Sequence, residues 1–427
     1  MKIKYILATF FLCSGILLGI DMTLLHAQTR FERMDSNNDG WVSQQEYLGK
    51  PFAFNRMDRN GDGYISSAEA EGTPLNNSPT GGKRKFAHET VETEDTSQAA
   101  DLIYIDTHNH LIGWVKNMNG QEGGFNCSGP AEIALAAMNK SGVRLNLVMP
   151  MPQDDEKDNK LIMDYLLPVM EKYPGRFAVL GGGGSLNVMI QEAIAAGGVT
   201  DGLLQRFDNK AAELVYKGAV GFGEMTAEHF SMGEGHHYES APPDHLLFLR
   251  LADLAAKYDI PIDIHMEAIP EEMGMPARFK SPNPSVLTPN IAGFERLLAH
   301  NRNARIIWVH LGWDNTGRRT VGLTRKLMQS HPNLYMSIRI ASGMQKRPAA
   351  MKLTFPLDDQ GNLKEEWLDL FNEFPDRFVI GSDEIVLRSN KHPSAGSVES
   401  TVHMLEQLPD ELRRKIGHEN ARRLYRL

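Results

Sequence analysis

Short apolar runs rich in β-formers alternate with amphipathic segments over the last three-quarters of the chain. The apolar runs occupy residues 103–106, 145–150, 177–180, 219–224, 260–265, 306–310, 334–338 and 378–383. Between them, segments such as 132–140, 245–258 and 291–301 repeat apolar residues at helical spacing. Eight strands alternating with helices predict an α/β fold, a (β/α)₈ barrel spanning residues 102–427.

Side chains that bind metals stand at the ends of several of these runs. In a parallel barrel the carboxyl ends of the strands meet at one face, so these residues are expected to converge. His108 and His110 are two positions apart, and in a strand they point to the same side. A lone histidine at a strand end is more often structural than a ligand, but a converging set favours a divalent metal. The candidates are His108, His110, Glu224, His265, His310 and Asp383.

Residues 28–71 contain two copies of the twelve-residue EF-hand loop, which predicts a small all-α EF-hand pair that binds Ca²⁺. Oxygen donors at loop positions 1, 3 and 5, the carbonyl of residue 7 and the glutamate at position 12 surround the ion. Val42 and Ile65 hold the same loop position and can pair as a β-bridge. The predicted ligands are Asp35, Asn37, Asp39, the Trp41 carbonyl and Glu46, then Asp58, Asn60, Asp62, the Tyr64 carbonyl and Glu69.

The N-terminus has the pattern of a secretory signal peptide. Lys2 and Lys4 precede an apolar segment over residues 5–20, and Ala27 suits cleavage by a signal peptidase. We expect residues 1–27 to be removed and the protein to be periplasmic or secreted, without stable membrane insertion. The alternative is an uncleaved membrane anchor. Cys127 is the one cysteine beyond the signal and cannot form an internal disulfide.

The composition of the chain indicates which classes of binding partner to expect. The formal net charge is −9, which gives little support to nucleic-acid binding. Residues 72–101 are rich in turn formers and acidic residues and are expected to be a linker. A small-molecule substrate is the expected partner, and homo-oligomerisation stays open.

Residues 102–427 resemble the amidohydrolase superfamily, in its branch of amidohydrolase-related proteins that includes aminocarboxymuconate-semialdehyde decarboxylase-like enzymes. The resemblance rests on His-x-His after the first run, on His265, on Trp308-Val309-His310-Leu311-Gly312, on Gly381-Ser382-Asp383 and on the closing Gly417–Leu424 segment. It implies that His108, His110, His265 and Asp383 bind a divalent transition metal. It also implies that Asp383 takes a proton from water and that His310 assists as acid, base or charge stabiliser.

Three nitrogen donors and a carboxylate suit zinc, with manganese or iron as weaker candidates. Some members of the superfamily place a carboxylated lysine or a glutamate after strand four to bridge two metals, and Glu224 holds that position. The alternative is that Glu224 orients a ligating histidine or contacts the substrate. We expect one metal rather than two.

These features predict an exported, metal-dependent hydrolase acting on an ester, lactone, amide or related bond. A non-oxidative decarboxylase of an aromatic or unsaturated acid on the same metal site is the alternative from the same branch. A calcium-dependent binding protein with an inactive barrel is the alternative from another class. Arg339, which can hold a substrate carboxylate or form a structural ion pair, and His237, in the loop after Glu224, are candidate substrate contacts.

Overall fold

The chain consists of two compact units, Met1–Lys83 and Arg84–Leu427. In the first unit the computed structural model describes residues 31, 34, 42–43, 47, 51–59, 64–65 and 67–70. In the second it describes residues 103–116, 122–153, 162–233, 236–279, 282–343, 349–387 and 397–427. The division falls within residues 72–101, the expected linker.

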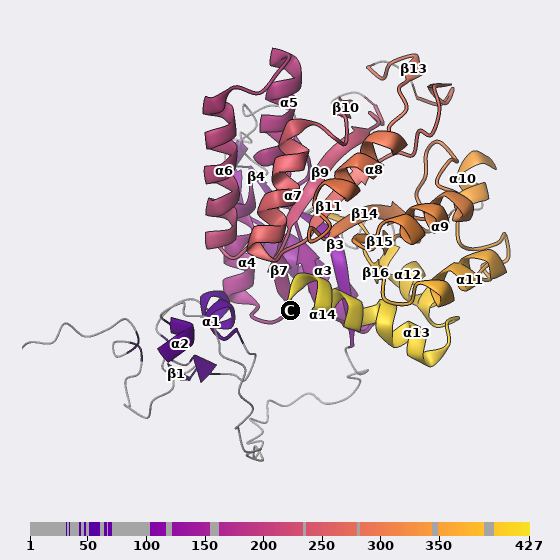
Figure 1. Cartoon of the computed structure of the whole chain (residues 1–427). Helices are drawn as coiled ribbons and strands as arrows, with labels where there is room; N and C mark the ends of the chain where they lie inside the picture. Colours follow the sequence, from indigo (N-terminus) through magenta and orange to yellow (C-terminus); the bar gives the residue numbers. More distant parts are fainter. Residues whose placement is uncertain are drawn as a thin grey trace, which may run out of the picture. The chain divides into compact units, whose positions relative to one another are not determined.

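The larger unit is a parallel β-barrel surrounded by helices, as the alternating pattern predicts (Figure 1). The ring closes because β8 follows β7 after a single residue and pairs with β9, while β16 pairs with β3. Its strands are β3 (Tyr104–Ile112), β6 (Val143–Val148), β7 (Phe177–Val179) with β8 (Gly181–Gly182), β9 (Phe222–His229), β11 (Ile262–Met266), β14 (Ile306–Leu311), β15 (Leu334–Ile338) and β16 (Phe378–Ile380).

Short strands extend or decorate the barrel. β10 (Glu239–Ser240) pairs with β9 antiparallel, and β17 (Glu384–Leu387) continues the ring beside β3. Two small hairpins consist of β4 (Trp114–Lys116) with β5 (Glu122–Phe125), and of β12 (Met273–Gly274) with β13 (Val286–Leu287).

Helices cover the outside of the ring. They are α3 (Ser128–Lys140), α4 (Leu167–Lys172), α5 (Leu186–Ala196), α6 (Asp201–Tyr216), α7 (Leu246–Tyr258), α8 (Ile291–His300), α9 (Val321–Ser330), α10 (Ala349–Thr354), α11 (Glu365–Glu373), α12 (Ser397–Leu405) and α13 (Asp410–Arg414). Helix α7 shows why they form: Leu247, Leu251 and Leu254 recur at helical spacing, and all three are buried against the barrel.

The C-terminal helix α14 (Asn420–Tyr425) covers the amino-terminal end of the barrel (Figure 1). A π-helical turn, Lys415–Glu419, leads into it. Ala421, Leu424 and Tyr425 pack with Ile105 and Val379 in a cluster of buried apolar side chains inside the ring. The helix therefore closes the end of the barrel opposite to the strands' carboxyl ends.

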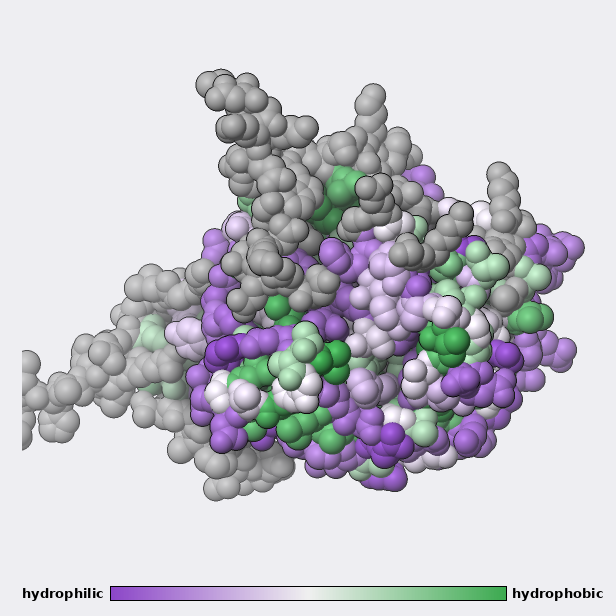
Figure 2. Space-filling model, turned by 90° about the horizontal axis from the view of Figure 1, so that it is seen from above, coloured by the Kyte–Doolittle hydropathy of each residue, from purple (hydrophilic) through white to green (hydrophobic). Residues whose placement is uncertain are grey.

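Apolar side chains lie in groups among polar ones on the face that Figure 2 shows. Among the described residues, no helix is both long enough and apolar enough to cross a membrane.

Two strands run well past the ends that the sequence predicts. β3 does not end at Asp106 but runs on to Ile112, so His108 and His110 lie within the strand. The register of β3 against β6 shifts between Asp106 and Asn109, which keeps this polar stretch inside the barrel wall. β9 likewise continues past Glu224 to His229, because β10 and β11 both pair with its extension.

Gly312 lets two neighbouring strands approach each other at their carboxyl ends. Its φ is +97°, and a Cβ atom there would lie 2.4 Å from the carbonyl oxygen of Arg339. We expect Gly312→Ala to lower the free energy of unfolding of the barrel by about 2 to 5 kcal/mol, from backbone strain plus overpacking. Gly361→Ala is the control, because Gly361 also has a positive φ but open space around it. Urea unfolding of both variants tests this, and equal losses would contradict it.

Candidate metal centre

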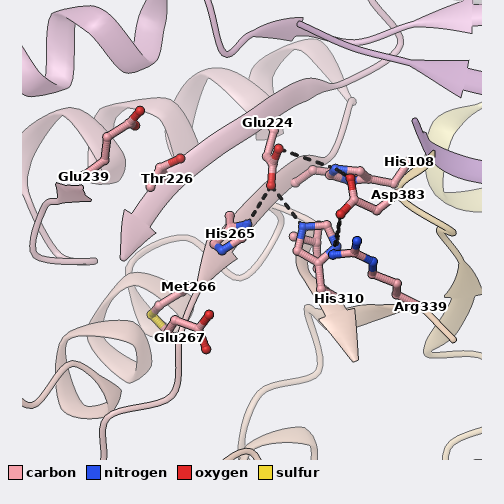
Figure 3. A network of polar contacts seen from close by, with 12 residues as sticks. His108, Glu224, Thr226, Glu239, His265, Met266, Glu267, His310, Arg339 and Asp383 are labelled. Atoms are coloured by element: carbon pink, nitrogen blue, oxygen red, sulfur yellow. Dashed lines mark hydrogen bonds and ion pairs between the residues drawn. The ribbon is translucent and has the colours of Figure 1, made fainter. Parts of the chain in front are cut away.

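The six metal-capable side chains singled out from the sequence lie in one cluster inside the barrel (Figure 3). His108 and His110 come from β3, Glu224 from β9, His265 from β11 and His310 from β14. Asp383 lies between β16 and β17. All of them are buried except His265, whose side chain is 12% exposed.

One half of the cluster consists of two imidazoles facing two carboxylates. Nε2 of His108 lies 3.6 Å from Oε2 of Glu224 and 3.9 Å from Oδ1 of Asp383. Nε2 of His110 lies 3.4 Å and 3.3 Å from the same two oxygens. Ligand atoms of a tetrahedral zinc ion are about 3.3 Å apart, as bonds of about 2.0 Å require. These four atoms therefore have the spacing of a metal-ligand set.

The other half is arranged around the second oxygen of Glu224. Oε1 of Glu224 lies 2.8 Å from Nδ1 of His265 and 3.0 Å from Nε2 of His310. Glu224, His265 and His310 form a second group whose ligand atoms are close enough to hold an ion. His265 was expected beside His108 and His110, whereas in the structure Glu224 lies between His265 and these two residues. One oxygen of Glu224 thus faces each half, which is the arrangement of a bridging carboxylate.

Two of these residues have unusual backbone conformations. His310 has a φ of +64° and Asp383 a φ of +56°. Left-handed backbone costs a residue with a Cβ atom about 1 to 2 kcal/mol. The amide of Asp383 donates to the carbonyl oxygen of His108 at 2.8 Å, which fixes this turn against β3. The fold thus holds both side chains in the cluster against a local cost.

The electrostatics of the cluster fit a cation. Burial alone would lower the pKa of His108, but Glu224, Asp263 and Asp383 raise it to about 10. Burial would raise the pKa of Asp383, yet Arg339 and the neighbouring histidines lower it. Two ionised carboxylates are thus held away from water, and their counter-charge comes from Arg339 and from protonated histidines. A divalent cation would supply that charge instead.

An unsatisfied imidazole supports the same conclusion. His108 is fully buried, and neither of its ring nitrogens has a hydrogen-bond partner among the described residues. A buried polar atom without a partner is costly. Nε2 of His108 faces the carboxylates, where a metal ion would be its partner. The buried His, Asp and Glu side chains are therefore a divalent-metal site.

Arg339 is an ion-pair partner in the structure. Its Nη1 lies 2.6 Å from Oδ2 of Asp383, and its guanidinium stacks on the ring of Trp313 at 4.2 Å. The contact orients Asp383 and holds its charge. The structure thus shows the ion pair, and contact of Arg339 with a substrate carboxylate stays a prediction.

His237 lies outside the cluster of metal-capable side chains. Its side chain is exposed. Of the nearby histidines, His229 lies beside His265, and His236 lies beside His229. The His229 ring is 4.7 Å from those of His265 and His236, with edge-to-face geometry in both pairs. His229 belongs to β9, and its place in the strand decides which histidine points inward.

Sequence reasoning missed the residues that hold the ligands in place. Asp106 accepts hydrogen bonds from the backbone and the hydroxyl of Ser382, beside Asp383. Asn109 accepts from the amide of Glu384 at 3.0 Å, on the other side of Asp383. The sequence did contain a signal for these residues. In β3, Asp106 and Asn109 lie next to the histidines, and a buried strand carries polar side chains mainly where they support a functional site.

Glu228 is a buried carboxyl near the cluster that titrates at neutral pH. Burial raises its pKa to about 7, although Ser240 and Tyr238 donate hydrogen bonds to it at 2.7 Å. The folded protein therefore binds more protons than the unfolded chain between about pH 4.5 and 7, and stability falls as pH rises through this window.

We expect Glu228→Gln to be more stable than wild type at pH 8, by up to about 3 kcal/mol, and equal to it near pH 4. Urea unfolding across this range tests it, and parallel pH curves would contradict it.

The EF-hand unit has a small core of its own. Val42 pairs with Ile65, as predicted, and β1 (Val42–Ser43) and β2 (Tyr64–Ile65) form an antiparallel pair. Helices α1 (Pro51–Met57) and α2 (Ser67–Ala70) flank the second loop. Glu69, at the last position of this loop, is buried and accepts a hydrogen bond from the Arg59 amide at 2.8 Å.

Three of the predicted calcium ligands, Asp58, Tyr64 and Glu69, are among the described residues. The others lie outside them, namely Asp35, Asn37, Asp39, Trp41, Glu46, Asn60 and Asp62.

Comparison with known families shows to which family the barrel belongs. The amidohydrolase family profile matches residues 105–427, three-quarters of the chain and all of the barrel's ligands. The chain belongs to the amidohydrolase family. An EF-hand profile matches residues 53–69. This amidohydrolase is therefore an enzyme with a buried metal site, preceded by an EF-hand region.

Similar solved structures are distant in sequence. A probable 2-pyrone-4,6-dicarboxylic acid hydrolase from Acinetobacter baumannii with citric acid bound is 10% identical, over 76% of this chain and 100% of that one, with a TM-score of 0.42. A dihydroxybenzoic acid decarboxylase from a Polaromonas species, with manganese and 2-nitroresorcinol, is 12% identical over 76% and 97%, with a TM-score of 0.40. A 5-carboxyvanillate decarboxylase from Novosphingobium aromaticivorans, with manganese, is 13% identical over 79% and 100%, with a TM-score of 0.37. No curated protein matches the chain.

Proposed function

We propose that this amidohydrolase is an exported, metal-dependent hydrolase acting on an ester, lactone, amide or related bond of a small molecule. The observation that carries the proposal is the place of Asp383. Its carboxylate lies 3.3 Å from Nε2 of His110 and is kept ionised by Arg339. An ionised carboxylate beside the metal-binding nitrogens is placed to accept a proton from the attacking water.

A divalent metal, zinc in our proposal, would be held by His108, His110 and Asp383 with Glu224 or His265, and when bound it lowers the pKa of water toward about 7. Asp383 takes the proton of the nucleophile and returns it to the leaving group. His310, with Nδ1 3.8 Å from Oδ2 of Asp383, faces the same space and can hydrogen-bond the oxygen on which negative charge develops. Burial of the cluster excludes bulk water, which strengthens each of these interactions.

Arg339 supports the role of Asp383 in this proposal. Its guanidinium is bound to the carboxylate of Asp383 and stacked on Trp313. We therefore assign it to holding the proton acceptor, and we propose a substrate whose reacting group is a carbonyl rather than a free acid.

The experiment that tests the reaction measures two things: incorporation of oxygen from water into the product, and release of carbon dioxide. The zinc-loaded protein is incubated in H₂¹⁸O with a panel of esters, lactones, amides and aromatic acids. We expect ¹⁸O in an acid product and no release of carbon dioxide. We expect a His108→Ala/His110→Ala variant to form no product. Release of carbon dioxide without ¹⁸O would replace the proposal by a decarboxylase.

For the EF-hand region we propose that Ca²⁺ stabilises this unit and does not control the barrel. The core of the unit consists of Phe31, Val42, Phe54, Ile65 and Ala70, which is little apolar area for independent stability. We expect Glu46→Gln/Glu69→Gln to lose calcium binding by calorimetry while barrel activity stays within about twofold of wild type, since ligand loss acts locally. A parallel loss of activity would show that calcium regulates the barrel.

A further inference from the structure

A chain of polar contacts runs from the last helix to the metal centre. Asp263 of β11 is fully buried, and its Oδ1 accepts a hydrogen bond from the Tyr425 hydroxyl at 2.8 Å. Its Oδ2 faces Nδ1 of His108 at 3.5 Å. Neither Oδ2 of Asp263 nor Nδ1 of His108 has another hydrogen-bond partner among the described residues. The two atoms are therefore each other's natural partners.

Tyr425 is held firmly in position. Its side chain is 1% exposed and packs with Ile105 and Val379 inside the amino-terminal end of the ring. Arg305, next to β14, donates through Nε to the carbonyl oxygen of Leu424 at 3.0 Å. The hydroxyl thus reaches Asp263 from a helix end that is packed on one side and hydrogen-bonded on the other.

The two histidines of β3 have different supports. Nδ1 of His110 lies 3.0 Å from the carbonyl oxygen of Met149, a backbone group. Nδ1 of His108 faces the Asp263 carboxylate instead. In both rings Nε2 is the atom that points toward Glu224 and Asp383. An imidazole binds a metal through an unprotonated nitrogen, and an acceptor opposite the other nitrogen fixes that tautomer and the ring orientation.

We propose that Asp263 and Tyr425 are positioning residues for the metal centre: Asp263 accepts the Nδ1 proton of His108, and the Tyr425 hydroxyl fixes the orientation of that carboxylate. The C-terminal helix thereby sets the affinity of the site for its metal. The inference rests on the metal site of the proposed function. It adds a role for the amino-terminal end of the barrel, which the catalytic residues do not reach.

The test measures metal affinity directly. Full-length Asp263→Asn, Tyr425→Phe, the double variant and Tyr335→Phe are stripped of metal and titrated with Zn²⁺ against a chromophoric chelator. Tyr335→Phe is the matched control, because Tyr335 belongs to the same buried cluster but stacks near Arg377 and Arg423. The Co²⁺-loaded proteins provide a second readout, the d–d absorption spectrum, which reports ligand geometry.

We expect Asp263→Asn to weaken Zn²⁺ binding by about 10- to 100-fold, as loss of a histidine's outer partner does. Tyr425→Phe should weaken it less, with a shifted Co²⁺ spectrum, and Tyr335→Phe should match wild type. The double variant should bind as Asp263→Asn does, because in our proposal the hydroxyl acts through the carboxylate. Wild-type affinity and spectrum in Tyr425→Phe, or additive losses in the double variant, would overturn the inference.

Two further results separate this inference from its alternatives. Leu424→Val loosens the same helix without touching the hydroxyl. If it weakens Zn²⁺ binding as much as Tyr425→Phe at an equal loss of thermal stability, packing is the cause and the positioning role is wrong. A wild-type protein that binds no Zn²⁺ in the barrel would instead overturn the metal site itself, together with the proposed hydrolase.

Discussion

Replacing both His108 and His110 by alanine is expected to empty the barrel of transition metal and to lower kcat/KM by about 10³-fold or more. The two imidazoles provide the nitrogen donors that face Oε2 of Glu224 and Oδ1 of Asp383, at 3.3 to 3.9 Å. Without them the remaining carboxylates cannot hold a cation with comparable affinity. Elemental mass spectrometry of protein purified without chelator, alongside turnover of a substrate found in the panel, measures both effects.

The control is His300→Ala/His403→Ala, which removes two histidines that pair with Asp253 and Glu406. It should keep its metal and its activity. One transition metal per chain in wild type would agree with our expectation of a single metal. Two per chain would make Glu224 a bridging ligand between the halves of the cluster. Calcium alone, in wild type and variant alike, would contradict a catalytic barrel.

Asp383→Asn is expected to lower kcat/KM by about 10²- to 10⁴-fold while the fold is retained. Asparagine keeps the size of the side chain and tolerates the left-handed backbone at this position. It cannot accept the proton of water, and it leaves Arg339 without its carboxylate partner. Metal content, kcat/KM and thermal unfolding of the variant measure the three effects separately.

Asp259→Asn is the matched control, because Asp259 is also an aspartate with a positive φ, 53°, but it pairs with Arg305 and Arg426. Its activity should equal that of wild type. A fully metal-loaded Asp383→Asn protein with activity within a few-fold of wild type would show that another group accepts the proton.

The barrel and the membership of its cluster could be predicted from sequence, because both depend on local patterns. Alternating apolar runs set the strands, and strand ends in one barrel converge whatever the details of packing. The pattern could not decide whether Glu224 bridges two metals or orients a histidine, and so it left the contact of Glu224 with His265 open. It depends on how β9 and β11 pair, where the register shifts between Ile262 and Ile264.

The supporting residues were also beyond sequence reasoning. Tyr425 and Asp263 are 162 positions apart, and nothing in either local pattern indicates that they meet. Likewise, His237 and His236 are neighbours in sequence, and only the structure shows that His236 is the one that packs on His229 of β9. Long-range pairing thus decides the partners of each ligand, while short-range pattern decides the ligand types.

The left-handed backbone at His310 and Asp383 has a consequence for how this sequence can change over generations. Each position costs about 1 to 2 kcal/mol that glycine would not incur. Selection for stability and selection for catalysis therefore oppose each other at these two residues. A descendant released from its catalytic task should gain stability by losing them, and these sites should be among the first to drift.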